Sequence, residues 1–228
     1  MNGYFITGTD TGVGKTLVTL AVMELLKRRG FEVAGMKPVA SGCNHDATGL
    51  RSSDAMQIMH ACSSTPPYSQ VNPYAFEAAI APHIAAARSS ESIRIAKIVS
   101  LCRDLEATAE RVVVEGVGGW EVPLGSDTQL PDLACRLKLP VILVVGLRLG
   151  CINHALLTAS AIRSTGLDFC GWIANQQQPG VEAMEENINT LQERIGAPLL
   201  GVLPWREHPN PAEMARYLED FPGWEISD

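Results

Sequence analysis

The sequence lacks the features that mark several large classes of protein. Its six cysteines are widely spread, with no C-x-x-C pair and no histidine at zinc-finger spacing. Eighteen basic residues stand against 25 acidic ones, which gives a net charge of −7, and the one basic run is residues 27–29. The strongest apolar run, residues 139–147, is too short to cross a membrane. These absences argue against a zinc finger, a general nucleic-acid binder and a membrane-spanning protein.

The start of the chain also lacks the charged and then apolar pattern of a secretory signal peptide. Together with the scattered cysteines, this predicts a cytoplasmic protein with free thiols. No internal repeat and no low-complexity linker divides the 228 residues. We therefore expect a single domain over residues 1–228.

Short apolar runs alternate with helical stretches along the chain. The pattern predicts helices over residues 15–29, 153–164 and 181–195, and strands over residues 4–7, 31–36, 112–114, 140–145, 169–174 and 199–203. The apolar runs are continuous, which is typical of a parallel sheet that is covered on both faces. The order predicts an α/β fold with a doubly wound, mainly parallel sheet. Such sheets bind ligands at the carboxyl ends of their strands.

A glycine-rich segment, GTDTGVGKT at residues 8–16, lies between the first expected strand and the first expected helix. Its small residues allow main-chain N–H groups to surround a phosphate chain, and the helix N-terminus adds positive potential. In this pattern Lys15 reaches the β- and γ-phosphates and the Thr16 hydroxyl binds Mg²⁺. A strict G-x-x-x-x-G-K-[ST] motif needs glycine at position 9, where this chain has threonine. We therefore interpret the segment as a variant phosphate loop of the P-loop NTPase type; the alternative is a plain glycine-rich turn.

Further candidate residues follow the other expected strands. Glu115 ends the third strand and is the expected acid for Mg²⁺, with Asp54 as a second candidate whose alternative role is to start a helix. Lys37 follows the second strand, either facing the transferred phosphate or lying at the surface. Asn175 ends the fifth strand, where its side-chain amide either forms hydrogen bonds with a nucleotide base or caps a helix. The Gly-Val-Gly-Gly segment at residues 116–119 allows close approach of the main chain to a ligand, or forms an ordinary turn.

These segments occur together in one known family. The chain resembles dethiobiotin synthetases over nearly its whole length. Beyond the phosphate loop, the matching segments include GMKPVASG (35–42), LRSSD (50–54), VNPY (71–74), VEGVGGW (114–120), LGCINH (149–154), GWIAN (171–175) and LPW (203–205). KPVASG and EGxGG in this order are far more specific than the phosphate loop alone.

The resemblance implies an ATP- and Mg²⁺-dependent cyclo-ligase of biotin synthesis. Such an enzyme joins CO₂, supplied from bicarbonate, to 7,8-diaminononanoate and releases dethiobiotin, ADP and phosphate. The implied intermediates are a carbamate and a carbamic–phosphoric anhydride. The resemblance also implies a homodimer whose active sites are shared between subunits.

The resemblance implies a role for each matching residue. Lys15 and Lys37 are catalytic, and Thr16, Asp54 and Glu115 hold Mg²⁺. The implied nucleotide-binding residues are Gly12, Val13, Gly14, Lys15, Thr16, Leu17, Asp54, Glu115, Gly116, Val117, Gly118, Asn175, Gln176, Pro204, Trp205 and Arg206. The implied substrate residues are Thr11, Lys37, Ser41, Gly150, Cys151 and Asn153, the last three at a helix N-terminus of the partner subunit.

The chain departs from the family pattern at two points. Position 12 is glycine, where relatives often carry glutamate. Near Pro211, where relatives often place an acid by the ribose, this chain offers Glu207 or Glu213 instead.

Two other functions stay open at this point. A regulatory ATPase of the partition or septum-positioning type shares the fold, but carries a lysine where this loop has Asp10. A module that binds nucleotide without turnover leaves Lys37 and Ser41 without a role.

Overall fold

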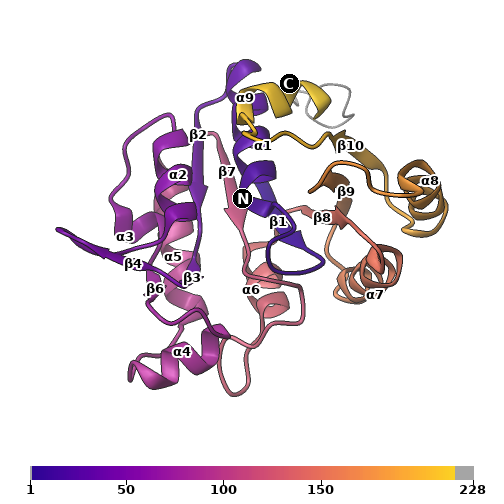
Figure 1. Cartoon of the computed structure of the whole chain (residues 1–228). Helices are drawn as coiled ribbons and strands as arrows, with labels where there is room; N and C mark the ends of the chain where they lie inside the picture. The colour runs from indigo at the N-terminus through magenta and orange to yellow at the C-terminus, as the bar shows by residue number, and fades with distance from the viewer. Residues whose placement is uncertain (1, 219–228) are drawn as a thin grey trace.

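The computed structural model describes residues 2–218, and its centre is a sheet of six strands (Figure 1). The strand order is β10-β9-β8-β1-β7-β2, and every pairing in this sheet is parallel. The predicted doubly wound parallel sheet is confirmed. Its strands are β1 (Gly3–Gly8), β2 (Val33–Met36), β7 (Arg111–Glu115), β8 (Val141–Leu147), β9 (Phe169–Gln176) and β10 (Leu199–Leu203).

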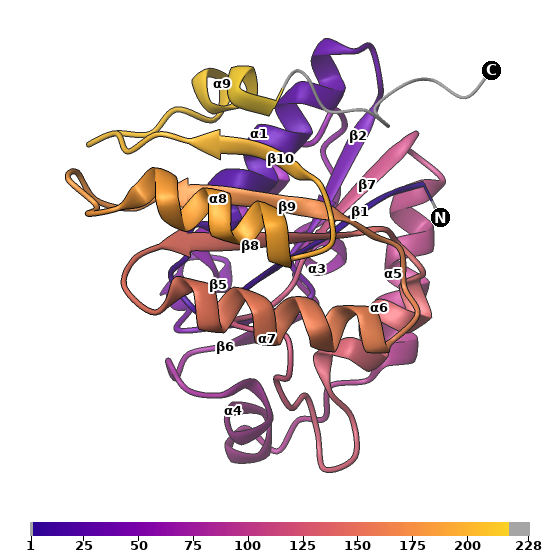
Figure 2. The ribbon, with the colours of Figure 1, turned by 90° about the vertical axis from the view of Figure 1, so that its right-hand side faces the viewer.

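Helices cover both faces of the sheet, which is why its central strands are apolar throughout. In β7, Val113 packs on one face, whereas Val112 and Val114 pack on the other, because successive side chains alternate along a strand. The face of Val113 is covered by α1 (Lys15–Arg28), α2 (Ser53–Ala61) and α9 (Pro211–Met214). The opposite face is covered by α5 (Ile95–Glu106), α6 (Leu130–Leu137), α7 (Cys151–Ser164) and α8 (Met184–Arg194), of which α7 and α8 run side by side in Figure 2.

The stretch of sequence between β2 and β7 contains short elements that the sequence pattern did not reveal. Strands β3 (Val39–Ser41) and β6 (Tyr74–Phe76) form a small parallel sheet, and β4 (Asn44–Asp46) and β5 (Gly49–Arg51) form an antiparallel hairpin. The same stretch contains the short helices α3 (Tyr68–Val71) and α4 (Pro82–Arg88). A 3₁₀ helix over Ala215–Leu218 follows α9 near the other end of the described residues. Elements of three to seven residues are too short for hydrophobic periodicity to detect.

Several predicted boundaries are wrong by a few residues. Helix α8 starts at Met184 rather than residue 181, because Ala183 takes a left-handed conformation just before it. Helix α7 starts earlier than predicted, at Cys151, because left-handed Gly150 serves as its N-cap. Strand β2 starts at Val33, since the Phe31 N–H still bonds to Leu26 O at the end of α1. Within residues 2–218, no helix combines the length and apolarity needed to cross a membrane.

Candidate active site

A cleft of about 780 Å³ opens at the carboxyl ends of β1, β2 and β7. The phosphate loop forms one side, and an apolar wall from Val39, Ala40, Val122 and the segment before α4 forms another. The predicted site residues that line the cleft are Thr11, Gly12, Gly14, Lys15, Thr16, Lys37, Ser41, Asp54, Glu115, Val117 and Gly118. Segments far apart in the sequence therefore meet at one edge of the sheet, as the strand-end rule predicts.

The phosphate loop has the predicted strand–loop–helix arrangement, with β1 ending at Gly8 and α1 beginning at Lys15. Gly12 and Gly14 have φ angles of 75° and 90°, in the left-handed region that favours glycine. The two differ in the space around them. A Cβ at Gly14 would lie 2.1 Å from Asn175 Nδ2, whereas a Cβ at Gly12 would have no atom of residues 2–218 within 4 Å apart from its two chain neighbours. Glycine at position 14 therefore also makes room for the Asn175 side chain.

Lys15 joins the phosphate loop to the loop after β7. Its ammonium donates to Asp10 O at 2.8 Å and to Gly118 O at 2.6 Å. Burial, together with the nearby charge of Lys37, lowers the pKa of Lys15 to about 8 against the opposing effect of Glu115. An entering phosphate would supply the negative charge that favours the ammonium form.

Lys37 and Glu115 form a buried ion pair at the floor of the cleft. The Lys37 ammonium donates to Glu115 Oε1, lies 3.5 Å from Asp54 Oδ2 and donates to Gly116 O at 3.3 Å. Burial acts to lower the pKa of Lys37, but the carboxylates of Glu115 and Asp54 outweigh it and raise that pKa. Lys37 is therefore a fixed cation beside the phosphate loop.

Two carboxylates, Asp54 and Glu115, lie beside this cation, and the Thr16 hydroxyl joins Glu115. The Thr16 hydroxyl donates to Glu115 Oε1 at 3.0 Å, and Glu115 Oε2 has no hydrogen-bond partner among residues 2–218 although the side chain is fully buried. A hydroxyl and two carboxylates suit Mg²⁺, which prefers oxygen ligands and keeps several waters. This hydroxyl and these two carboxylates make the floor of the cleft the candidate Mg²⁺ site. Elsewhere, the described part of the chain offers no cluster of three or more His, Cys, Asp or Glu side chains for a metal.

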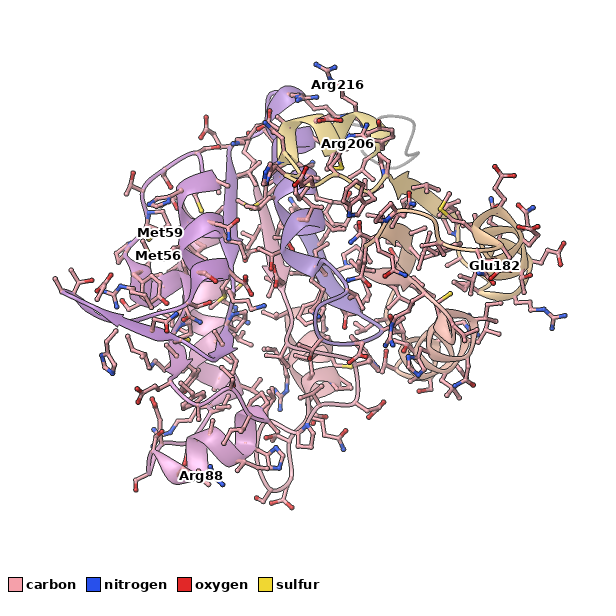
Figure 3. The ribbon with its side chains drawn as sticks, in the orientation of Figure 1. Met56, Met59, Arg88, Glu182, Arg206 and Arg216 are labelled. Carbon is pink, nitrogen blue, oxygen red and sulfur yellow. The ribbon has the colours of Figure 1, made fainter. Side chains whose placement is uncertain are left out.

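The residues predicted to hold the base lie together at the ends of β9 and β10, outside the lining of the cleft. Asn175 is buried and its Nδ2 donates to Val13 O at 2.9 Å, so its Oδ1 is left to accept from a ligand. The Trp205 N–H donates to Gln176 Oε1 at 3.3 Å. Arg206 pairs with Glu213 at 2.9 Å, on the side of the molecule where Figure 3 labels Arg216 as well.

Other predicted residues also lie outside the cleft lining. Val13 is buried in the core, Leu17 packs against the same cluster, and Gly116 contributes only its carbonyl, which accepts from Lys37. Pro204 is partly buried beyond the end of β10. Glu207, the other candidate acid for the ribose, is exposed.

The predicted carboxylate site at the start of α7 does not line this chain's own cleft. Gly150 and Asn153 are exposed, and the preceding Leu149 is 99% exposed. The Cys151 side chain packs in the core, and its N–H already donates to Arg148 O at 3.0 Å.

Sequence reasoning missed two side chains that hold the phosphate loop. Arg148 pairs with Asp10 Oδ2 at 2.7 Å, and the Gln177 amide donates to Gly12 O. Gly146 leaves room for Gln177, since a Cβ there would lie 2.3 Å from Gln177 Oε1. Both side chains come just after β8 and β9, so the strand-end rule that found Asn175 would also have indicated them.

Comparisons with known proteins agree with this geometry. Residues 2–213 match a family model described as an AAA domain. The chain is 48% identical over 216 residues to an ATP-dependent dethiobiotin synthetase BioD of Xanthomonas axonopodis pv. citri, covering 95% of this chain and 96% of that protein. Proteins of the same name from Pseudomonas aeruginosa and Marinobacter nauticus are 47% and 46% identical, each with 96% of both chains covered.

Two solved structures share the fold. The cell division protein FtsY of Thermotoga maritima has a TM-score of 0.52 at 14% identity, covering 96% of this chain and 68% of that one. The MinC:MinD cell division complex of Aquifex aeolicus has a TM-score of 0.54 at 12% identity, covering 96% of this chain and 86% of that one. At such low identity these likenesses show the fold alone.

Proposed function

The chain belongs to the family of ATP-dependent dethiobiotin synthetases, and on that premise we propose that it closes the ureido ring of dethiobiotin from 7,8-diaminononanoate, CO₂ and ATP. The observation that carries the proposal is the buried Lys37 ammonium beside the phosphate loop, at the floor of a cleft with an apolar wall. A cation at this place suits two anions that must meet, a carbamate and the γ-phosphate.

The reaction has three bond-forming steps. One substrate amine attacks CO₂ and loses a proton, which gives a carbamate. A carbamate oxygen attacks the γ-phosphorus as the bond to ADP breaks, which gives a carbamic–phosphoric anhydride. The second amine attacks the carbamoyl carbon, inorganic phosphate leaves with the bonding electrons, and loss of a proton completes the ring.

The residues of the cleft serve these steps by charge and position. Lys37 offsets the charge of the carbamate and the γ-phosphate, and Lys15 holds the β- and γ-phosphates. Thr11 and Ser41 both line the cleft and contact the diamine end of the substrate. The Ser41 hydroxyl is buried without a partner within residues 2–218, which suits a ligand contact.

Thr16, Asp54 and Glu115 would hold Mg²⁺, which supplies positive charge to the β- and γ-phosphate oxygens when bound. The unpartnered Oε2 of Glu115 supports this assignment. Asn175 is proposed to accept from the exocyclic amine of adenine through Oδ1, since its Nδ2 already bonds to Val13 O. Gln176, Pro204, Trp205 and Arg206 would enclose the base.

We further propose a cytoplasmic homodimer in which the start of α7 completes the partner's active site. Leu149 and Leu157 are 99% and 64% exposed, which is unusual for large apolar side chains and suits a covered surface. Gly150 and Asn153 lie between them in sequence. A nine-carbon substrate carries its carboxylate far from the diamine end, and a helix N-terminus is a favourable place for it.

The test of the reaction is phosphate release by the purified protein, with and without diaminononanoate and bicarbonate. The proposal expects release only when both are present, together with formation of dethiobiotin. Release that is independent of the diamine would indicate a regulatory ATPase instead. Nucleotide binding without any release would indicate a binding module.

The shared site has its own test, in which inactive Lys37→Gln and inactive Asn153→Ala proteins are mixed. If sites are shared, subunit exchange rebuilds one intact site in each heterodimer and part of the activity returns. Exchange that is demonstrated by mass spectrometry but restores no turnover would reject the shared site, as would a fully active monomer.

A further inference from the structure

Lys37 lies at the edge of the main sheet, yet both of its main-chain polar groups are bound. It directly follows β2, which is the last strand in the sheet order. Its N–H donates to Val71 O at 2.9 Å, and its carbonyl accepts from Asn72 Nδ2 at 2.6 Å. Val71, the last residue of α3, and Asn72 after it thus supply the hydrogen bonds that a neighbouring strand would give, and one of these bonds comes from a side chain.

Asn72 is 3% exposed and both ends of its amide are bound. Its Nδ2 donates to Lys37 O and, at 3.3 Å, to Tyr74 O, while its Oδ1 accepts from the Tyr68 hydroxyl at 2.8 Å. Two carbonyls on one side and a hydroxyl on the other fix the orientation of the amide. A buried amide of this kind is costly unless it is fully hydrogen-bonded, and here it is.

The Tyr68 hydroxyl extends the network to helix α2. It accepts from the Ser52 N–H at 2.8 Å, and because an N–H can only donate, the hydroxyl proton must point to Asn72. Burial raises the pKa of Tyr68, so the hydroxyl keeps that proton. The Arg51 guanidinium lies 4.2 Å from the centroid of the Tyr68 ring and holds the ring from one face.

Ser52 is the residue that begins the helix carrying Asp54. Its side chain accepts from the Ala55 N–H at 3.3 Å as the N-cap of α2, the helix that carries the labels Met56 and Met59 in Figure 3. Asp54 is the second residue of this helix, and its Oδ2 lies 3.5 Å from the Lys37 ammonium. The hydrogen-bond network Ser52–Tyr68–Asn72–Lys37 therefore connects the two main-chain segments that carry Asp54 and Lys37, whose charged side chains meet in the cleft.

We propose that Tyr68 and Asn72 are positioning residues of the active site. They hold the main chain at Lys37 in a fixed position relative to the start of α2. The inference rests on the proposed phosphoryl transfer, for which Lys37 and Asp54 must keep their separation. Neither Tyr68 nor Asn72 lines the cleft, so both act only through the residues that they hold. The VNPY segment, which matches the family, thereby gains a role that its sequence alone does not reveal.

The chain offers a matched pair of variants for the test. Tyr68→Phe removes a hydroxyl that accepts from the Ser52 N–H and donates to Asn72. Tyr74→Phe removes a hydroxyl that likewise accepts from a main-chain N–H, that of Arg94 at 2.9 Å, but lies outside the network. Asn72→Asp is the stronger variant, because it keeps the acceptor for Tyr68 and replaces the donor to Lys37 O by an oxygen.

Three quantities separate positioning from a general loss of structure: kcat, the dissociation constant of ADP from calorimetry, and the rate at which an amine-reactive reagent labels Lys37 in the folded protein. We expect kcat to fall about tenfold in Tyr68→Phe and on the order of a hundredfold in Asn72→Asp, since a displacement of about 1 Å has such effects. ADP binding should stay within about twofold of wild type, because the phosphate loop is untouched. Labelling of Lys37 should accelerate in both variants, and Tyr74→Phe should match wild type in all three quantities.

The proposal is overturned if Tyr68→Phe and Asn72→Asp lower kcat no more than Tyr74→Phe does, or if Lys37 labelling is unchanged in both. If Asn72→Asp does not fold, the comparison of the two phenylalanine variants decides alone. A wild-type protein without diamine-dependent turnover would reject the proposed function, and the labelling rates would still test whether the network holds Lys37.

Discussion

Gly12 and Gly14 form a matched pair of left-handed glycines in one phosphate loop, and alanine at each should have different consequences. Their φ angles of 75° and 90° impose a similar backbone cost on alanine, about 1–2 kcal/mol. At position 12 no described residue other than the two chain neighbours lies within 4 Å of the added methyl group. At position 14 the methyl group would lie 2.1 Å from Asn175 Nδ2, so Asn175 must move.

The movement breaks the hydrogen bond from Asn175 to Val13 O, which contributes about 0.5–1.5 kcal/mol. We therefore expect the free energy of unfolding to fall by about 1–2 kcal/mol in Gly12→Ala and by about 1.5–3.5 kcal/mol in Gly14→Ala. Gly14→Ala should also weaken MgADP binding more than Gly12→Ala does, because Asn175 is the proposed contact of the base. Urea unfolding and calorimetry measure the two effects.

A double-mutant cycle isolates the collision with Asn175. In an Asn175→Ala background the obstructing amide is absent, so Gly14→Ala should then cost no more than Gly12→Ala does in the wild-type background. If Gly14→Ala and Gly12→Ala are equally destabilising in the wild-type background, or if the Asn175→Ala background does not reduce the cost, the argument from space is wrong.

Three further predictions concern the two lysines and one buried thiol. Lys15→Ala should lower kcat by roughly 10²–10³, the effect of losing one electrostatic donor, and a kcat within about threefold of wild type would contradict its role. Lys37→Gln should lower kcat strongly while calorimetry finds nucleotide affinity nearly intact; an equal loss of ATP binding would make Lys37 a nucleotide ligand instead. The same variant should reduce the free energy of unfolding by about 3–5 kcal/mol, because it leaves the carboxylate of Glu115 buried without its cation. Burial raises the pKa of Cys102 from 9.0 to about 12, so between these values the unfolded thiol releases a proton that the folded one keeps. The free energy of unfolding should therefore fall with rising pH by up to about 1.36 kcal/mol per pH unit from this thiol, and urea unfolding at about pH 8 and about pH 10 should show a shallower loss in Cys102→Ala.

Local sequence patterns were enough to predict the main sheet and the phosphate loop. A strand that is buried on both faces must be apolar throughout, as residues 141–145 are, and a loop that surrounds phosphate needs left-handed positions such as Gly12 and Gly14. The carboxyl ends of parallel strands meet at one edge, so the placement of Lys37 and Glu115 near the loop also followed from the pattern. The same rule applied to β8 and β9 would have found Arg148 and Gln177.

The exact limits of elements depended on single residues whose conformation the pattern does not specify. Ala183 in a left-handed conformation delays α8, although alanine gives no sign of a helix boundary. The short elements β3 to β6 have too few residues to show a period, and β3 and β6 are held by packing of Val39, Tyr74 and Phe76 into the core. Strand β3 carries Ser41 to the cleft, together with Val39 and Ala40 of the apolar wall.

The sequence by itself determined which chemistry the chain carries, because the lysines, the acids and the glycines of the loop lie in segments whose order and spacing are fixed along the chain. Only the tertiary structure decided how these groups are held. The Lys37–Glu115 ion pair joins residues that are 78 positions apart, and the contact of Asn175 with Val13 spans 162 positions. In the network, the bond from Ser52 to Tyr68 spans 16 positions and the bond from Asn72 to Lys37 spans 35. Such contacts depend on side-chain directions that a linear pattern does not contain, since they arise only when separate elements pack together in three dimensions.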